Sequence, residues 1–188
     1  MTTKKLWFGF LAVMTISFAV LLYYGREIYR QAPPIPDKVV SASGEVLFTG
    51  QDIKDGQNVW QSMGGQELGT VWGHGAYQAP DWSADWLHRE SVFILHKLAH
   101  QTDSMPFDKL SEEKQAALKV LLQKDLRPNS YHEETKTLVI SDLRAEAFAD
   151  NSKYYGGLFT NDPARDQERE TYSIPENSLK DPERVQIG

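Results

Sequence analysis

Cysteine is missing from all 188 residues of the chain. Its absence excludes disulfides, cysteine-ligated zinc, iron–sulfur clusters and haem attached through thioethers. Basic residues are few: Lys and Arg total 20 against 26 Asp and Glu, for a formal net charge of -6, and they form no basic stripe. We therefore expect no nucleic acid partner. The sequence also lacks a nucleophile elbow, a P-loop and a dinucleotide-binding fingerprint.

One long hydrophobic run lies close to the N-terminus. Residues 6–24, "LWFGFLAVMTISFAVLLYY", carry no charge, and as a helix they would span about 28 Å, close to the ~30 Å hydrocarbon core of a bilayer. Trp7 at one end and two tyrosines at the other suit the membrane interfaces. A cleaved signal peptide is the alternative, because Lys4 and Lys5 would form its basic start. The run is long for a signal peptide, however, and no Ala-x-Ala-like cleavage site follows it. We therefore predict a transmembrane anchor.

The sequence is expected to divide into four parts. Residues 1–31 form a cytoplasmic N-terminus and the anchor helix, and residues 32–42 a stiff proline-rich linker. Residues 43–160 form the folded domain. Residues 161–188 form a charged, irregular tail whose run "DPARDQERE" faces solvent. A short basic N-terminus ahead of a large acidic domain favours export of that domain, into the periplasm of a Gram-negative bacterium.

Helical patterns dominate the expected domain, so its fold class is mainly α. Residues 41–50 predict a turn and strand around Gly44, and residues 130–141 a small β-hairpin. Apolar residues recur with helical spacing in four segments, which are residues 50–63, 79–101, 108–129 and 142–159.

Side chains within these helices have expected roles in packing and capping. In the first helix, a buried stripe is expected from Ile53, Val59, Trp60 and Met63. In the second, the expected core residues are Leu87, Phe93 or Ile94, and Leu98, and Asp81 or Ser83 caps the start. The fourth helix is expected to close at Gly156 and Gly157.

Tryptophan and glycine are concentrated in residues 57–86. This block holds four of the five tryptophans, and six glycines lie in it or just before it. Glycine lets the backbone turn left-handed or approach another group closely. Tryptophan beside glycine in a loop indicates a docking surface or a cofactor pocket. The alternative is a well-packed, turn-rich core.

Several segments resemble a known family. "EIYRQAPPIP", "GQNVWQSMGGQELGTVWGHGAYQAPDWSADWLHRE" and the late "DPER" are similar to the N-terminal region of quinol-dependent nitric oxide reductases. The resemblance covers nearly the whole chain, and its most unusual part is residues 72–90. It implies a cytochrome c-like domain that binds no haem and lies on the periplasmic side of a membrane-embedded catalytic part.

The resemblance also implies what stands in the place of the haem. Val59, Gln61, Ser62 and Met63 occupy the position of a haem-attachment motif, and they cannot supply two thioethers and an imidazole. We expect Trp60 and its neighbours to fill the volume of the haem, because an empty cavity of that size is costly. Electrons would come from quinol, oxidised by the partner.

A shared calcium site is a further implication of the resemblance. In the family, the glycine carbonyl and tyrosine hydroxyl of "GHGAY" face a Ca²⁺ ion that is bridged by haem propionates and a glutamate of the catalytic part. Here these residues are Gly75 and Tyr77. Ca²⁺ takes six to eight oxygen ligands, so a partner must supply the others. The residues expected at that interface are Trp72, His74, Trp82, Asp85 and Trp86.

The resemblance places catalysis outside this chain. The family's catalytic part carries haem b, haem b3 and a non-haem iron, ligated by histidines of its own membrane helices. The 5 histidines here lie outside the apolar run, so we expect no catalytic residue in this chain. Its expected role is that of a subunit or N-terminal part of the reductase in the bacterial inner membrane. The alternative is an orphan membrane-anchored periplasmic interaction module without a redox role.

Two other groups of polar residues are expected to be structural. His96 and His100 have the i, i+4 spacing of a zinc site, but no glutamate follows His96 and no third ligand is evident. We therefore expect solvated or capping histidines here and at His88. Asp81 and Asp85 are expected to be helix caps or interface groups, not an acid–base pair.

Overall fold

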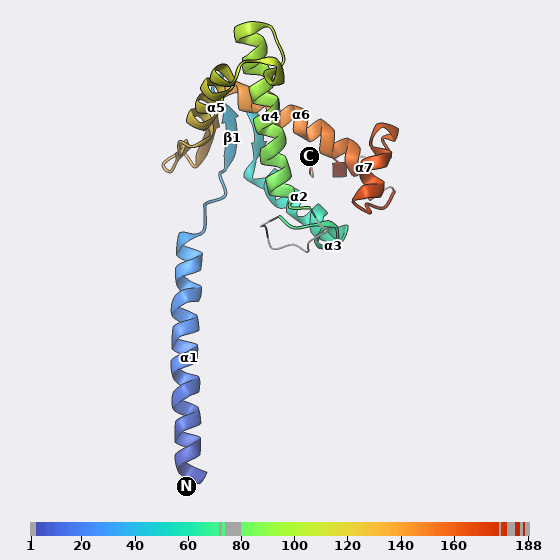
Figure 1. Ribbon diagram of the computed structural model, residues 1–188. Helices are drawn as coiled ribbons and strands as arrows, with labels where there is room; N and C mark the ends of the chain where they lie inside the picture. The colour runs from blue at the N-terminus through green and yellow to red at the C-terminus, as the bar shows by residue number, and fades with distance from the viewer. Residues whose placement is uncertain are drawn as a thin grey trace. The chain divides into compact units, whose positions relative to one another are not determined.

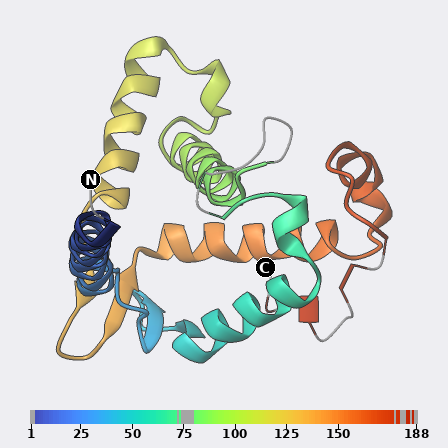
Figure 2. The same cartoon turned by 90° about the horizontal axis from the view of Figure 1, so that it is seen from below.

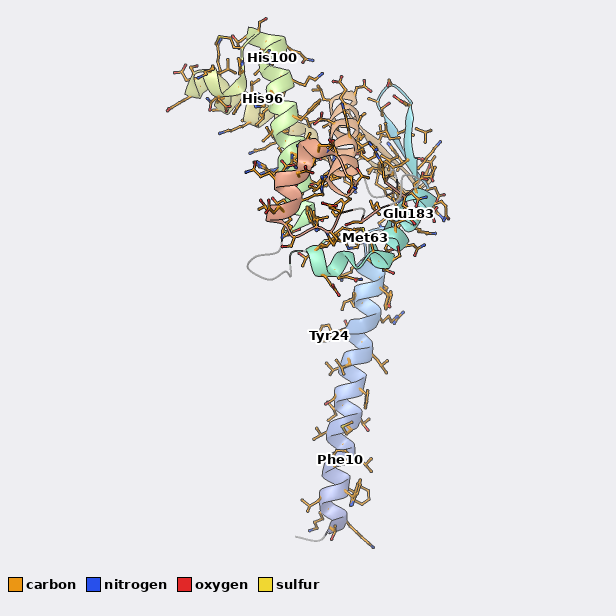
Figure 3. The ribbon with its side chains drawn as sticks, turned by 90° about the vertical axis from the view of Figure 1, so that its right-hand side faces the viewer. Phe10, Tyr24, Met63, His96, His100 and Glu183 are labelled. Carbon is orange, nitrogen blue, oxygen red and sulfur yellow. The ribbon has the colours of Figure 1, made fainter. Side chains whose placement is uncertain are left out.

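The computed structural model describes residues 3–71, 73, 80–176, 178–179, 183–184 and 186 (Figure 1). The chain divides into two compact units, Met1–Ile35 and Pro36–Gly188. The first unit contains α1 (Thr3–Gln31), which has no buried residue; Phe10 and Tyr24 extend from it (Figure 3). This helix contains the whole apolar run and is long and apolar enough to cross a membrane.

The second unit contains a four-stranded sheet. Its strands are β1 (Lys38–Ser41), β2 (Val46–Thr49), β3 (Tyr131–His132) and β4 (Thr137–Ile140), in the order β2-β1-β4-β3. The two antiparallel pairs are the predicted turn-and-strand element around Gly44 and the predicted hairpin. A parallel pairing of β1 with β4 joins them.

The position of β1 corrects one expectation from the sequence. Residues 32–42 were expected to form a linker, but Lys38–Ser41 is a central strand with Val39 only 1% exposed. The Asp37 amide also donates to the Lys136 carbonyl at 2.8 Å. The folded unit therefore includes the end of the proline-rich segment, because β4 supplies the hydrogen-bond partners that a spacer would lack.

The remaining elements are mainly helical, as the sequence predicts. The α-helices are α2 (Gly50–Ser62), α3 (Gly65–Leu68), α4 (Trp82–Asp103), α5 (Glu112–Leu126), α6 (Asp142–Leu158) and α7 (Asp166–Thr171), with short 3₁₀ turns at Phe107–Lys109 and Pro163–Arg165. Helix α4 packs against both α5 and α6 (Figure 2). Helix α6 runs through Gly156 and Gly157 to Leu158, just beyond its predicted end.

Two clusters of buried side chains hold the helices together. The first, which we call the aromatic cluster, is made by Trp60, Trp82, Trp86, Tyr154, Tyr155, Phe159 and Tyr172, with Val59, Met63, Leu68, Leu158, Ile174 and Leu179. The second, which we call the aliphatic cluster, is made by Ile94, Leu95, Ala99, Leu110, Leu118, Leu122 and Ala147, with Phe93, Leu98, Phe107, Leu126 and Leu143. Helix α4 contributes to both.

The predicted core stripe of α4 is partly wrong. Leu87 is 53% exposed, whereas Ile94 is 1% exposed and Leu98 packs against the aliphatic cluster. The first turns of α4 are instead buried through Trp82 and Glu90. Apolar residues occupy more than one face of this helix, so spacing alone did not identify the buried face.

The segment after Asn161 was expected to be irregular, and this is also corrected. It contains the 3₁₀ turn and α7, and Ile174 and Leu179 are buried in the aromatic cluster. The Leu179 amide donates to the Phe159 carbonyl at 3.2 Å. The described part of the tail thus completes the core, because its few apolar residues cover the C-terminal end of α6.

Candidate functional site

The residues predicted to stand at a haem-attachment position lie at the end of α2. Val59 is buried and Met63 is half-buried against the aromatic cluster, whereas Gln61 and Ser62 are exposed. The Ser62 hydroxyl donates to the Val59 carbonyl at 2.8 Å. This end of α2 therefore turns an apolar face inward, which confirms the predicted stripe at Val59, Trp60 and Met63. Ile53 of that stripe is half-buried and is not part of the aromatic cluster.

Trp60 connects α2 to the aromatic cluster. Its ring lies 6.3 Å from Trp82 and 5.8 Å from Phe159, with edge-to-face geometry in both pairs. Gly65 provides the room, because a Cβ atom there would lie 2.2 Å from Cδ2 and Cε2 of the indole. The tryptophan and the glycine of this block thus fit together as one packing unit.

Trp82 is at the centre of the cluster and is 8% exposed. Its ring contacts those of Tyr155, Phe159 and Tyr172 at 6.1, 5.5 and 5.6 Å. The buried Nε1 atom has no hydrogen-bond partner among the residues that the structure describes. Trp82 therefore belongs to the core of this chain, and its predicted contact with a partner stays a prediction.

The loop before α4 is anchored at both ends. The Thr70 amide donates to the Pro80 carbonyl at 3.0 Å, and the Trp82 amide donates to the Thr70 carbonyl at 2.8 Å. Asp81 caps α4 by accepting hydrogen bonds from the amides of Ser83 and Ala84, which confirms the predicted cap. The predicted calcium ligands Gly75 and Tyr77 and the predicted interface residues Trp72 and His74 lie outside the described residues.

Asp85 joins α4 to α6 through a polar network. Its Oδ2 atom accepts a hydrogen bond from the Tyr155 hydroxyl at 2.6 Å and pairs with Nε of Arg89 at 2.9 Å. Trp86 stacks on the Tyr155 ring at 5.4 Å with an interplanar angle of 7°. Burial raises the pKa of Tyr155, and the hydrogen bond to Asp85 raises it further. The phenol is therefore held neutral beside a carboxylate.

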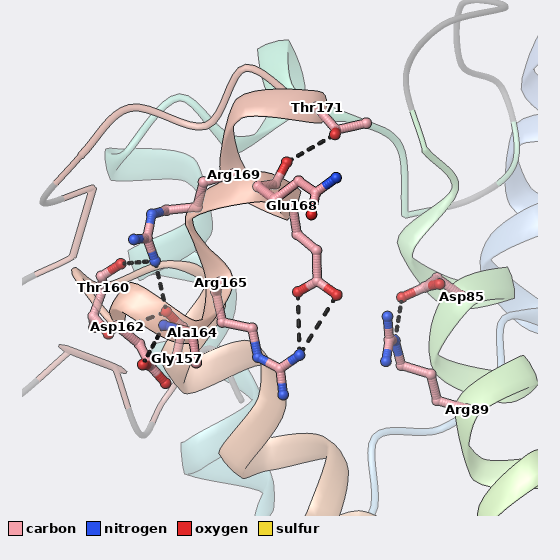
Figure 4. Close-up of polar contacts among 11 residues, drawn as sticks. Asp85, Arg89, Gly157, Thr160, Asp162, Ala164, Arg165, Glu168, Arg169 and Thr171 are labelled. Carbon is pink, nitrogen blue, oxygen red and sulfur yellow. Dashed lines mark hydrogen bonds and ion pairs between the residues drawn. The ribbon is translucent and has the colours of Figure 1, made fainter.

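Tyr154 has different neighbours from the adjacent Tyr155. The guanidinium groups of Arg89 and Arg165 lie 3.3 and 4.3 Å from the centroid of its ring. Burial raises the pKa of Tyr154 to about 12. Arg165 also pairs with Glu168 at 3.2 Å (Figure 4), so the charge run after α6 packs against the aromatic cluster through Arg165.

Arg169 is the clearest departure from a solvated charge run. It is 5% exposed, and its Nη1 donates to the carbonyls of Gly157 and Thr160 at 3.3 and 2.7 Å (Figure 4). Its Nη2 pairs with Asp166. A cation at these carbonyls stabilises the C-terminal end of α6, so the prediction that this run faces solvent is wrong at Arg169.

The histidines of α4 face a groove between α4 and α6. His88, His96 and His100 line this groove of about 520 Å³, together with Asp150 of α6; His96 and His100 are labelled in Figure 3. In the described parts of the chain, no group of three or more His, Cys, Asp or Glu side chains is arranged to hold a metal ion. At one end the groove is also lined by Asp85 and Arg89, which contact Tyr155 and Tyr154 of the aromatic cluster.

These features define a mainly helical domain with a small sheet and a buried aromatic core. Residues 36–187 match the family model of the NorB cytochrome c-like domain, which is a domain of nitric oxide reductase. The chain belongs to this family, and its folded unit is therefore related to a subunit of nitric oxide reductase. No curated protein matched the chain.

Proposed function

We propose that the chain is a haem-free, membrane-anchored part of a quinol-dependent nitric oxide reductase. The family match over residues 36–187 carries this proposal. The assembled enzyme would reduce two NO molecules to N₂O with electrons from quinol, in anaerobic respiration or NO detoxification. Catalysis would belong to a partner polypeptide or part that holds haem b, haem b3 and non-haem iron, because the matched family is a domain of a nitric oxide reductase subunit.

The role of the folded unit would be to cover the periplasmic face of that catalytic part. Helix α1 would anchor it in the inner membrane, since its length and composition suit a bilayer. The aromatic cluster supports a structural role, because Trp60 and Trp82 fill the interior with side chains. The loop anchored by Thr70 and Asp81 would contact the partner, together with Trp86.

Affinity purification tests the proposal. The tagged full chain is isolated from native membranes in a mild detergent, and haem b and iron are measured in the eluate. We expect both to be recovered with a multi-helix protein rich in histidine, and the eluate to consume NO when quinol is supplied. Recovery of the chain without a haem-bearing partner would instead favour an orphan interaction module.

Calcium binding is a separate part of the proposal. Gly75 and Tyr77 would supply two oxygen ligands, and haem propionates and a glutamate of the partner the others. Calcium content per complex should fall in the variant Tyr77→Phe and stay unchanged in the matched control Tyr131→Phe, which lies in the β3–β4 hairpin. Equal calcium in both variants would remove Tyr77 from the site.

A further inference from the structure

Two adjacent tyrosines of α6 have opposite electrostatic surroundings. The Tyr155 hydroxyl donates to Asp85 Oδ2 at 2.6 Å, so a proton acceptor lies at its oxygen. The Tyr154 ring lies beneath the guanidinium groups of Arg89 and Arg165. A cation over an aromatic face opposes the removal of an electron from that ring, whereas a carboxylate that accepts the phenolic hydrogen bond can take up the proton when the ring is oxidised.

A chain of aromatic rings leads to Tyr155. Trp86 lies 5.4 Å from Tyr155, Tyr155 lies 6.1 Å from Trp82, and Trp82 lies 6.3 Å from Trp60, measured between ring centroids. Trp60 and Trp86 are half-buried, and Tyr155 and Trp82 are buried. Indole rings that solvent reaches are thus connected to a buried phenol by short ring-to-ring steps.

We propose that Tyr155 and Asp85 form a redox-active pair, and that Trp60, Trp82 and Trp86 carry an oxidising equivalent to it. The oxidant would be a one-electron oxidant of the class of nitrogen dioxide, which forms from NO and oxygen. Such an oxidant takes one electron from an indole and becomes nitrite. The indole radical cation then takes an electron from Tyr155, the phenolic O–H bond breaks, and the proton moves to Asp85. The products are a neutral tyrosyl radical, a protonated carboxyl group and nitrite.

The geometry explains why Tyr155 would be the end of this path. Its proton leaves along an existing hydrogen bond, so the oxidised phenol becomes a neutral radical. The positive charge left by the lost electron then resides on Arg89, whose side chain is 30% exposed. Arg89 pairs with Asp85 at 2.9 Å, which holds this carboxyl group in position beside the Tyr155 hydroxyl. This inference rests on the proposed function only for its oxidant, which forms from NO, because every residue of the path belongs to the described part of one chain.

Flash photolysis of the full-length chain in detergent tests the proposal. Tris(bipyridine)ruthenium with persulfate supplies the oxidant, and transient absorption follows the indole and tyrosyl radicals. We expect a phase in which indole radical decay and tyrosyl radical formation share one rate constant. This phase should disappear in Tyr155→Phe and persist in the matched control Tyr154→Phe. Persistence in Tyr155→Phe, or loss in Tyr154→Phe alone, would overturn the proposal.

The role of Asp85 has its own readouts. In Asp85→Asn the shared phase should slow by at least about tenfold, because a positioned base is lost, and its rate should then depend on buffer concentration. In the wild-type chain the rate should not change with buffer concentration, since the proton acceptor is internal. This second measurement needs no variant to fold, and a wild-type rate that rises with buffer base would contradict the assignment of Asp85.

Discussion

The aromatic and aliphatic clusters share helix α4 but are built from different types of side chain. The aliphatic cluster joins α4, α5 and α6 through Leu, Ile and Ala side chains, which is how helices commonly pack. The aromatic cluster is built from residues of α2, α4, α6 and the tail. Gly65 and Gly69 have no side chains, which leaves room for the rings of Trp60 and Trp82. The aromatic cluster therefore packs large rings against glycine backbone, whereas the aliphatic cluster packs the side chains of neighbouring helices against one another.

Replacement of Trp82 by alanine should produce the largest difference in stability between the two clusters. Trp82 contacts four aromatic rings, so Trp82→Ala should lower the free energy of unfolding by about 3–5 kcal/mol. Hydrogen exchange should also accelerate in α7, which the cluster holds. The matched variant Leu118→Ala in the aliphatic cluster should destabilise the domain while α7 stays protected. Equal hydrogen-exchange rates in α7 for both variants would contradict the prediction that the two clusters are destabilised independently.

Alkaline pH should weaken the aromatic cluster. The unfolded tyrosine pKa is 10.0, and burial raises the pKa of Tyr154 to about 12 and that of Tyr155 as well. Above the lower value the unfolded chain loses protons that the folded chain keeps, so the free energy of unfolding should fall as pH rises from about 10 to 12. Urea unfolding over this range measures the slope.

Two variants test the cause of this pH dependence. Tyr155→Phe removes one of the two raised groups, so its free energy of unfolding should fall less steeply with pH. Leu118→Ala changes only the aliphatic cluster and should keep the wild-type slope. A slope that is unchanged in Tyr155→Phe would show that this phenol ionises equally in both states.

A methyl group at Gly65 should have a smaller effect. Its Cβ would lie 2.2 Å from the Trp60 ring, so Gly65→Ala should cost about 1–3 kcal/mol through overpacking. The exposed neighbour Gln66 gives the control, and Gln66→Ala should change stability by less than about 0.5 kcal/mol. Similar unfolding midpoints for the two variants would mean that the indole moves aside freely.

Replacement of the N-cap residues of α4 and α5 should have the smallest effects on stability. Asp81 accepts hydrogen bonds at the start of α4, whereas Ser111 makes no such side-chain bond at the start of α5. Asp81→Ala should therefore cost about 1 kcal/mol and Ser111→Ala clearly less. Thermal unfolding of both variants checks the difference, and a larger loss at Ser111 would contradict the assigned caps.

Local patterns predicted most of the fold. The helix over Glu112–Leu126, the hairpin before α6 and the cap at Asp81 all follow from neighbouring residues. The parallel pairing of β1 with β4 and the burial of Arg169 do not. Each depends on partners that the fold brings together, a distant strand in one case and the Gly157 and Thr160 carbonyls in the other.

The site was predicted only in part. The place of Val59 and Trp60 in the core followed from spacing, whereas Gly75 and Tyr77 came from the family resemblance and stay predictions. The Tyr155–Asp85 pair was missed, because its members lie on different helices. One signal was available: the repeat in "DWSADW" places Trp82 and Trp86 one helical turn apart, on the face that meets Tyr155.

Haem content tests the central claim most directly, namely that aromatic side chains occupy the place of the haem. The full-length chain is produced in a host that lacks nitric oxide reductase but carries the cytochrome c maturation machinery. It is then purified in detergent and analysed by the pyridine haemochrome method and by urea unfolding. We predict a cooperatively unfolding protein without haem absorption, because side chains such as Trp60 and Trp82 already fill this core. One haem bound per chain would contradict it.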